Sequence, residues 1–197
     1  MRKKTQKIHF HLDLASQIIQ KDHVHFVSSE VAKARYDTHQ NGVNNVDYIA
    51  YQKSIFDQFI GIYLKSGSTL DYGCGEGAVL QRFIENLFIY DLYYHNDDTI
   101  FKRTFDNIIL IEVVEHFEDP IGEFKRLVER LNEGGRLIVQ TQFYTNFEQI
   151  EDWWYVRDAT HVSFYNIEAF KYLASQFNLT MIYTDHKSRI VLEKTYL

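Results

Sequence analysis

Three short, largely apolar runs predict strands, at residues 87–90, 105–111 and 136–141, and the run at 105–111 has the pattern of a strand buried on both faces of a sheet. Residues 68–71 predict a further strand, the first of the sheet. Around these runs, apolar residues recur at three- to four-residue spacing, which predicts amphipathic helices. The predicted helices are residues 47–64, 78–86 and 120–131. Strands that alternate with helices through short turns predict an α/β fold with a doubly wound, mostly parallel sheet.

Capping residues mark several of the predicted helix ends. Asp47 predicts the start of the first helix, and Asp119 followed by Pro120 predicts the start of the third. The glycine pair within residues 132–135 predicts a stop at the end of that third helix. The helices and strands of the main sheet therefore have defined expected boundaries.

The C-terminal part of the chain begins with an unusually long aromatic segment, residues 142–165. Long ordered loops at the carboxyl ends of strands usually shape a ligand site, so we expect that role here. Asn166 predicts the cap of a helix that runs through Phe177. Residues 180–185 and 189–194 then predict a closing antiparallel hairpin.

Residues 1–46 are expected to form a small N-terminal extension, a hairpin followed by a short helix at 29–37, ahead of a main domain at 47–197. Two His-x-His pairs fall in the predicted hairpin, where each pair would share one face of a strand. These pairs are His9 with His11 and His23 with His25. Four imidazoles across a hairpin could hold zinc, but the spacing matches no recognised zinc site and no cysteine assists. We expect a polar strand face and no metal site.

The composition is that of a folded protein without a surface for polyanions. Of 197 residues, 45% are hydrophobic and 24% are charged, and the net charge is -6. This balance disfavours the electrostatic attraction that nucleic acids need, so no nucleic-acid partner is expected. No apolar run approaches the roughly 18 residues of a membrane span, and the single cysteine, Cys74, rules out an intrachain disulfide. We expect a soluble, cytoplasmic protein, whose oligomeric state the sequence does not indicate.

The turn after the first predicted strand of the sheet has the pattern of a ligand-binding loop. Asp71 is followed by glycines at alternate positions, Gly73, Gly75 and Gly77, before the next predicted helix. Glycines let a backbone approach a ligand closely, and a helix start points unpaired N–H groups into the same space. The Asp71 carboxylate would repel a pyrophosphate but would bind an ammonium or hydroxyl group. The predicted ligand therefore carries a cationic or polyol end.

A nicotinamide-dependent oxidoreductase is a less favoured alternative. Gly73, Gly75 and Ala78 also satisfy the dinucleotide-binding pattern, and Asp91 stands where a ribose-binding acid belongs. However, Asp71 would face the pyrophosphate, and nothing after the sheet supplies a substrate-reducing domain. The pattern fits a different adenosine-containing cofactor better.

Several segments, in this order, resemble the class I S-adenosylmethionine-dependent methyltransferases. They are LDYGCGEG at 70–77, Asp91, FDNIILIEVVEHFEDP at 105–120 and LNEGGRLIVQT at 131–141. AKARYDTHQN at 32–41 and WWYVRDATHVSFYN at 153–166 are similar to one bacterial branch of that superfamily. Members of that branch often begin with a cysteine-containing zinc-ribbon-like segment, and those cysteines are absent here. The resemblance implies a Rossmann-like methyltransferase fold and S-adenosylmethionine as cofactor, and it implies no zinc.

The resemblance also implies a set of cofactor-binding residues. They are Asp71, Tyr72, Gly73, Cys74, Gly75, Gly77, Asp91, Leu92, Ile111 and Glu112. Asp91 would accept hydrogen bonds from the two ribose hydroxyls. Only a short segment separates Asp91 from the strand at 105–111, so the next helix and strand of the family fold are expected to be shortened or lost. Asp97 or Asp98 would then replace the acid that contacts the adenine amino group.

Methyl transfer needs a general base only when the acceptor is still protonated, because binding and alignment supply much of the acceleration. The candidate catalytic residues are Glu115, His116 and His161. Tyr36 and His39 are expected to close over the cofactor from the N-terminal side. The sequence thus predicts an enzyme that methylates a small-molecule acceptor. A non-catalytic cofactor-binding or regulatory module on the same fold is the alternative, motivated by the missing cysteines and the shortened segment.

Overall fold

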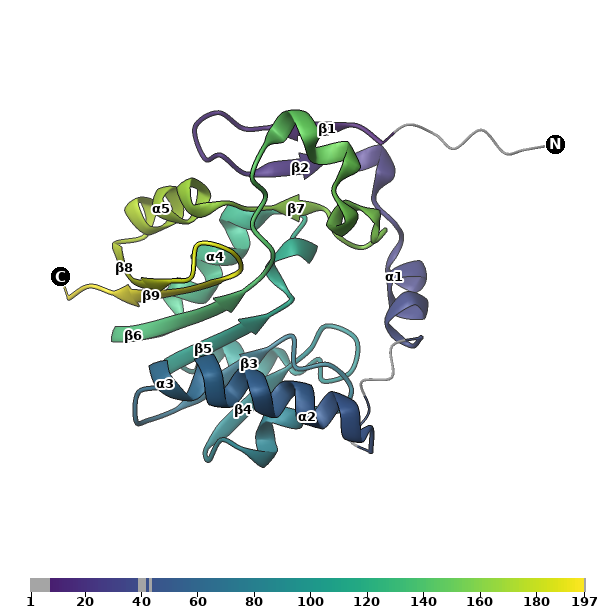
Figure 1. Cartoon of the computed structure of the whole chain (residues 1–197). Coiled ribbons are helices and arrows are strands. Elements are labelled where there is room, and N and C mark those ends of the chain that lie inside the picture. Colours follow the sequence, from purple (N-terminus) through teal and green to yellow (C-terminus); the bar gives the residue numbers. More distant parts are fainter. Residues whose placement is uncertain (1–7, 39–41, 43, 197) are drawn as a thin grey trace.

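A six-stranded sheet forms the centre of the computed structural model, which describes residues 8–38, 42 and 44–196. In spatial order its strands are β4 (Leu87–Tyr90), β3 (Thr69–Tyr72), β5 (Phe105–Ile111), β6 (Leu131–Gln140), β9 (Arg189–Lys194) and β8 (Leu179–Thr184). The first four are parallel, and β9 lies antiparallel to both of its neighbours. The predicted parallel sheet and the predicted closing hairpin are both confirmed (Figure 1).

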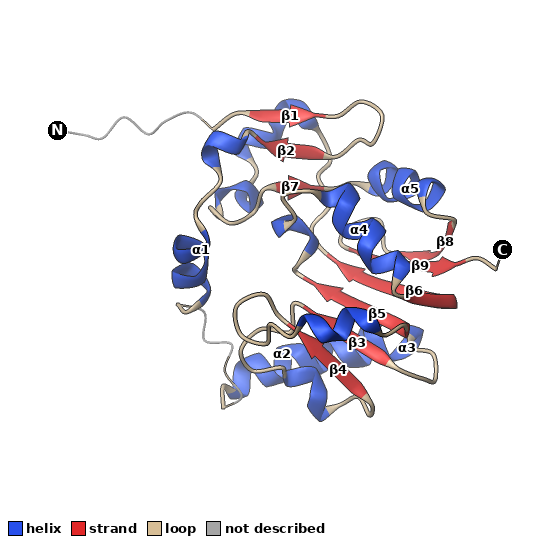
Figure 2. Ribbon diagram, turned by 180° about the vertical axis from the view of Figure 1, so that it is seen from behind, coloured by secondary structure: helices blue, strands red, loops and turns tan. Residues whose placement is uncertain are grey.

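Helices cover both faces of this sheet (Figures 1 and 2). The helices are α1 (Ser29–Tyr36), α2 (Val46–Ile55), a π-helical stretch (Phe56–Ile60), α3 (Gly61–Tyr63), α4 (Pro120–Glu129) and α5 (Ile167–Gln176). Side chains of β5 alternate between the two faces: Ile108 and Leu110 pack with α4 and α5, whereas Ile109 packs with Phe59 and Ile60. A strand buried on both faces needs apolar residues at every position, which explains the continuous apolar run.

A second, three-stranded sheet joins the N-terminus to the aromatic segment. Its strands are β1 (Phe10–Leu12), β2 (Ile19–Lys21) and β7 (Ser163–Phe164), all antiparallel. The predicted hairpin is thus present. Pairing of β2 with β7 attaches it to the aromatic segment of the C-terminal half (Figure 1). His23–His25 form a 3-10 helix, so the prediction that this pair shares a strand face was wrong.

Three predicted helix boundaries were wrong for local geometric reasons. Only Val79–Arg82 are helical, as a 3-10 helix, in place of the predicted helix at 78–86, because Ala78 before them has a left-handed φ of 40°. The glycines of 132–135 do not end a helix. They lie inside β6, where the register against β5 shifts after Leu131. Asn45, and not Asp47, caps α2, with its side chain accepting from the backbone N–H groups of Asp47 and Tyr48.

The segment between β4 and β5 contains no strand of the main sheet. Residues 91–104 hold only a bridge between Asp91 and His95 and a 3-10 helix at Asp98–Lys102. The predicted loss of a helix and a strand is therefore confirmed, and β4 is the edge of the sheet. In the part of the chain that the structure describes, no helix is long and apolar enough to cross a membrane.

Candidate active site

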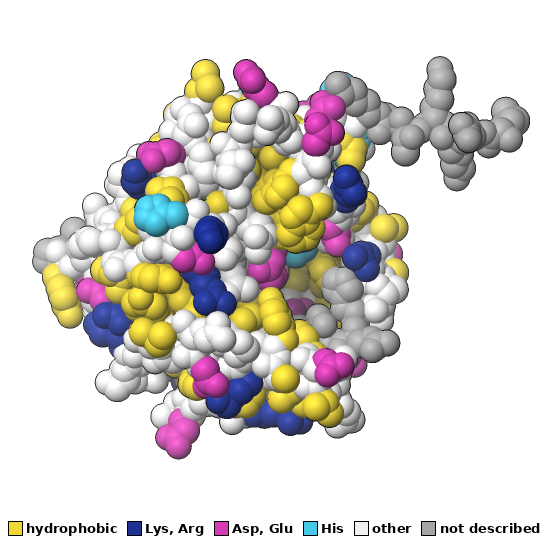
Figure 3. All heavy atoms as spheres, viewed as in Figure 1, with side chains coloured by type: hydrophobic (Ala, Val, Ile, Leu, Met, Phe, Trp, Pro, Cys, Tyr) yellow, Lys and Arg dark blue, Asp and Glu magenta, His cyan; other side chains and the backbone are white. Residues whose placement is uncertain are grey.

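A cavity of about 950 Å³ lies beyond the carboxyl ends of β3, β4 and β5. The glycine loop and the residues after β4 and β5 form one part of its wall, and α1, α2, the segment 154–162 and residues of α4 form most of the remainder. Acidic and histidine side chains are visible in a hollow on the face shown in Figure 3. Pockets for small ligands commonly measure about 300–1,000 Å³. This cavity therefore has room for a nucleoside-sized cofactor and a small second ligand together.

Two glycines of the loop meet different surroundings. Both have left-handed backbones, with φ of 81° at Gly73 and 66° at Gly75. A Cβ at Gly73 would lie 2.4 Å from a methyl carbon of Val113, whereas a Cβ at Gly75 would have no atom within 4 Å. Gly73 is thus required by the packing of the protein itself. Gly75 faces open space in the cavity wall.

Asp91 ties the glycine loop to the segment that follows β4. One oxygen of its carboxylate accepts from the backbone N–H of Gly75 at 2.9 Å. The other accepts from the N–H groups of Tyr93 and Tyr94 at 2.9 and 3.2 Å. The oxygen that accepts from Gly75 has a further lone pair, so Asp91 can hold the loop and still accept from a ligand in the cavity that it lines.

Most residues predicted from the sequence meet at this cavity. Those that line it are Tyr72, Gly73, Gly75, Asp91, Leu92, Ile111, Glu112, Glu115, His116 and His161. Three predicted cofactor residues do not line it: Asp71, Cys74 and Gly77. Asp71 lies buried under the loop, where burial and the nearby charge of Asp91 raise its pKa to about 7.

Of the other single residues predicted from the sequence, only one of those that the structure describes is found to line the cavity. Tyr36 lines the cavity, and His39 lies outside the described residues. Neither Asp97 nor Asp98 lines the cavity, and Asp97 instead caps the short helix after it by accepting from the N–H of Thr99. A direct contact between these two acids and a ligand in the cavity is therefore not supported.

Two glutamates share a tyrosine hydroxyl at the end of β5. The Tyr155 hydroxyl lies 2.9 Å from Glu112 Oε2 and 2.6 Å from Glu115 Oε1. A hydroxyl has one proton to donate, so one of the two carboxyl groups must be protonated and donate in return. Burial, followed by the charge of Glu115, raises the pKa of Glu112 to about 7, and burial likewise raises the pKa of Glu115. The pair therefore holds a transferable proton near neutral pH.

Glu112 also has an unusual backbone. Its φ of 55° lies in the left-handed region, which non-glycine residues rarely occupy. Its N–H donates to the carbonyl of Gln140 at 2.8 Å, and the Gln140 side chain donates to its carboxylate at 3.3 Å. Strained residues that their surroundings hold in place cluster at functional sites. The strain thus marks Glu112 as a functional candidate.

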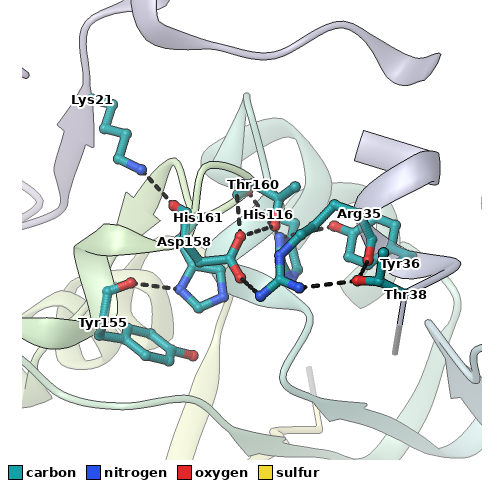
Figure 4. Close-up of polar contacts among 9 residues, drawn as sticks. All are labelled: Lys21, Arg35, Tyr36, Thr38, His116, Tyr155, Asp158, Thr160 and His161. Atoms are coloured by element: carbon teal, nitrogen blue, oxygen red, sulfur yellow. Dashed lines mark hydrogen bonds and ion pairs between the residues drawn. The ribbon is translucent and has the colours of Figure 1, made fainter. Parts of the chain in front are cut away.

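His116 and His161 lie next to each other, with ring centroids 4.9 Å apart (Figure 4). The backbone N–H of Val162 donates to the carbonyl of Glu115 at 2.8 Å and holds the two segments together. Burial lowers the pKa of both histidines; that of His161, lowered further by His116, is about 3. Both imidazoles are therefore neutral at physiological pH.

The cavity wall is strongly acidic. Among the described residues, eight carboxylate side chains and one arginine, Arg126, line it. The acids are Glu76, Asp91, Glu112, Glu115, Glu118, Asp119, Glu123 and Asp158. Such a wall attracts a cationic ligand and repels a polyanion.

The sequence did not single out Asp158 or Arg35, and it did not predict that two glutamates share the Tyr155 hydroxyl. Asp158 was placed only within the aromatic segment, and Arg35 only within a helix. In the structure, Arg35 pairs with Asp158 at 3.1 Å and fastens α1 to the cavity wall (Figure 4). The WWYVRDATHVSFYN segment was the available signal, because it contains both Tyr155 and Asp158.

Residues 47–184 match a family model described as a methyltransferase domain. The chain belongs to this methyltransferase family. The match covers more than half of the chain and includes the glycine loop, Asp91 and the residues at the end of β5. The prediction of class I methyltransferase membership is confirmed at the level of the family and the fold.

Individual relatives are distant. A tRNA U34 carboxymethyltransferase of Sulfurovum sp. (strain NBC37-1) is 32% identical over 62 residues, which are 32% of this chain and 21% of that protein. A 1,6-didemethyltoxoflavin-N1-methyltransferase of Burkholderia thailandensis, solved with 1,6-didemethyltoxoflavin and S-adenosylhomocysteine, is similar in structure. It superposes with a TM-score of 0.59 at 12% identity, over 97% of this chain and all of that one. N-methyltransferase NodS of Bradyrhizobium japonicum WM9, solved with S-adenosylhomocysteine, gives 0.55 at 14% identity, over 84% and 98% of the chains.

Proposed function

We propose that the protein transfers a methyl group from S-adenosylmethionine to a small-molecule acceptor bound in the same cavity. The observation that carries this proposal is the cavity itself, in which a glycine loop, Asp91 and a proton-holding glutamate pair meet at the carboxyl ends of β3, β4 and β5. Membership of the methyltransferase family supports it. The volume of about 950 Å³ supports a small acceptor beside the cofactor.

The residues present fit the cofactor in charge and in shape. S-adenosylmethionine supplies a methyl group already activated by its positive sulfonium, and the acidic wall suits that charge. The open space at Gly75 admits a ligand close to the backbone, and Asp91 keeps acceptor capacity for ribose hydroxyls. Gly73, Gly75, Asp91, Leu92 and Ile111 would hold the cofactor.

Glu112 is the better candidate for the base among the residues in the wall. A general base works best when its pKa is near the working pH, and the pKa of Glu112 is about 7. His161, with a pKa of about 3, is too weak a base for the role that the sequence analysis assigned to it. Glu112 would take the proton of an acceptor hydroxyl or amine, while Tyr155 and Glu115 hold its carboxylate in place.

The relative that acts on tRNA by its name does not change the proposed acceptor class. It matches over one third of this chain, and the eight acids of the cavity wall oppose a polyanion. A small neutral or cationic acceptor is compatible with the same wall.

Calorimetric titration tests the cofactor assignment. The intact protein is titrated with S-adenosylhomocysteine and, separately, with NADH. We expect S-adenosylhomocysteine to bind with a dissociation constant between about 1 μM and 1 mM, the range usual for enzyme ligands, and NADH not to bind. Binding of NADH alone would favour the oxidoreductase alternative, and absence of binding by both ligands at millimolar concentration would refute the proposal.

A further inference from the structure

Glu115, His116 and His161 gather three potential metal ligands on the cavity wall. One ligand atom from each side chain lies within 4.8 Å of the others. All three residues line the cavity, and Glu115 is fully buried within its wall. A ligand set of two imidazoles and one carboxylate suits divalent transition metals.

The two imidazoles are already oriented as metal ligands are. Nδ1 of His116 lies 2.9 Å from the carbonyl oxygen of Thr160, and Nδ1 of His161 lies 2.9 Å from that of Tyr155 (Figure 4). A carbonyl only accepts, so each Nδ1 carries the proton and donates it. The Tyr36 hydroxyl, 3.0 Å from Nδ1 of His116, is then a second acceptor for that N–H group. The second ring nitrogen of each histidine therefore keeps its lone pair. Histidines that bind metals typically donate their other N–H in this way, which fixes the tautomer and the ring orientation.

The glutamate supplies an independent indication of a cation-binding site. Oε1 of Glu115 accepts from the Tyr155 hydroxyl at 2.6 Å, while Oε2 is buried and has no hydrogen-bond partner. Buried polar atoms are nearly always satisfied, so a carboxylate oxygen without a hydrogen-bond partner beside two imidazoles needs an explanation. A bound cation provides one.

We propose that Glu115, His116 and His161 bind one divalent transition-metal ion of the zinc type, with its remaining coordination positions facing the cavity. Ligand atoms bound to one ion at about 2.1 Å lie roughly 3–4 Å apart. Binding would therefore draw the three side chains together by about 1 Å relative to the present 4.8 Å.

The neighbouring charges are compatible with a cation. The ammonium of Lys21 donates to the backbone carbonyl of Asp158 at 2.7 Å, and the carboxylate of Asp158 pairs with Arg35 at 3.1 Å (Figure 4). Glu112 adds a second carboxyl group that hydrogen-bonds to the same Tyr155 hydroxyl as Glu115.

The role that we give to the ion rests on the proposed methyl transfer. The proposal that the ion binds at this site does not rest on it. An ion at this place would hold an acceptor oxygen and lower the pKa of an acceptor hydroxyl, so that Glu112 could remove its proton. From the sequence, zinc was considered only at the N-terminal histidine pairs and in the absent cysteine-containing segment, and no metal site was expected. His116 and His161 are far apart in the chain and share no spacing motif.

Zinc titration of the metal-free protein tests the metal site in the absence of cofactor and acceptor. A negative result would therefore refute the metal site and leave the methyl-transfer proposal standing. The protein is stripped with a chelator and titrated with Zn²⁺ against a chromogenic chelator. We expect one ion per chain. The variants H116Q, H161Q and E115Q should each weaken zinc binding by at least about 10-fold, because even substitution of residues that only hydrogen-bond to a metal ligand has an effect of this size. H95Q, which alters a histidine outside the cavity wall, should bind as the wild type does.

X-ray absorption on the wild-type protein covers the case in which a variant fails to fold. The proposal expects two histidine nitrogens and one carboxylate oxygen at about 2.0–2.2 Å from zinc. It is overturned by absence of stoichiometric binding, by unchanged affinity in a folded H116Q/H161Q double variant, or by a sulfur ligand from Cys74.

Discussion

Asp91 has two tasks at the residue scale, since it holds the glycine loop and also faces the cavity. Replacing it with alanine removes a carboxylate that accepts from three backbone N–H groups. We expect D91A to weaken S-adenosylhomocysteine binding by about 10- to 100-fold, because hydrogen bonds to charged groups contribute about 1.5–3 kcal/mol. H161A should change this affinity much less. Calorimetry on both variants makes the comparison, and equal losses would mean that the cofactor lies elsewhere.

Glu112 provides a prediction about pH. Its pKa in the folded protein is raised from an ordinary 4.5 to about 7 by burial and by Glu115. A raised pKa means that its contribution to stability is fully present below pH 4.5 and is lost as the pH rises through about 7. The free energy of unfolding of the wild type should therefore fall between pH 5 and pH 8.

Chemical unfolding at successive pH values measures this slope. E112Q cannot ionise, so its free energy of unfolding should depend less steeply on pH in that window. E168Q is the matched control, because Glu168 is an exposed residue paired with Lys171 on α5. Equal slopes for wild type and E112Q would contradict the assignment of a raised pKa to Glu112.

The glycine loop gives the first prediction at the scale of elements. G73A should lower the free energy of unfolding by about 2 kcal/mol or more, because the new methyl group would overlap Val113 at a left-handed position. G75A should lower it by only about 1–2 kcal/mol, the cost of the left-handed backbone. Its methyl group points into free space, so G75A should instead weaken binding of S-adenosylhomocysteine.

Denaturant unfolding and calorimetry on the two variants separate these effects. A large stability loss in G75A, or wild-type affinity in that variant, would show that the cavity does not receive its ligand beside Gly75.

Helix α1 depends on an ion pair for its position over the cavity. Arg35 and Asp158 are 47% and 18% exposed, so the pair contributes at most about 1 kcal/mol to overall stability. R35A should leave the unfolding free energy nearly unchanged while the backbone amides of α1 exchange with solvent faster. Hydrogen exchange measures this, with K53A as control, since Lys53 of α2 pairs with Asp57 of the π-helical stretch that follows it. Unchanged exchange in R35A would show that the pair does not hold α1.

Most elements of the sheet were predictable because their signals are local. The strand at 105–111 needs apolar residues on both faces, and Asp119 with Pro120 marks the start of α4. The helix predicted at 78–86 failed because the left-handed turn at Ala78 leads into only a short 3-10 helix. The glycine stop failed because Gly134 serves a register shift in β6, which only the pairing with β5 reveals.

The candidate site was partly predictable for the same reason. The glycine loop and Asp91 lie at strand ends, where a single chain segment shows the pattern. The approach of His161 to His116 depends on the bond from Val162 to the carbonyl of Glu115, across distant segments. Such a contact has no local signal, so the shared tyrosine hydroxyl and the histidine pair emerged only from the structure.

At the scale of the whole molecule, one strand and one helix of the usual family fold are absent after β4, yet a cavity still forms at the strand ends. The N-terminal segment contributes to its wall: α1 and α2 supply Tyr36, Tyr48 and Gln52. The acidity of that wall then favours a cationic cofactor over a polyanion. Fold and charge together favour methylation of a small molecule.

Transfer of labelled methyl groups tests this account most directly. The intact protein is incubated with S-adenosylmethionine that carries a tritiated methyl group and with an extract of the cells from which the chain derives. The extract is then separated into small molecules, nucleic acid and protein. We predict label in the small-molecule fraction with the wild type and almost none with D91A. Label in nucleic acid or protein, or no transfer above the D91A background in any fraction, would contradict it.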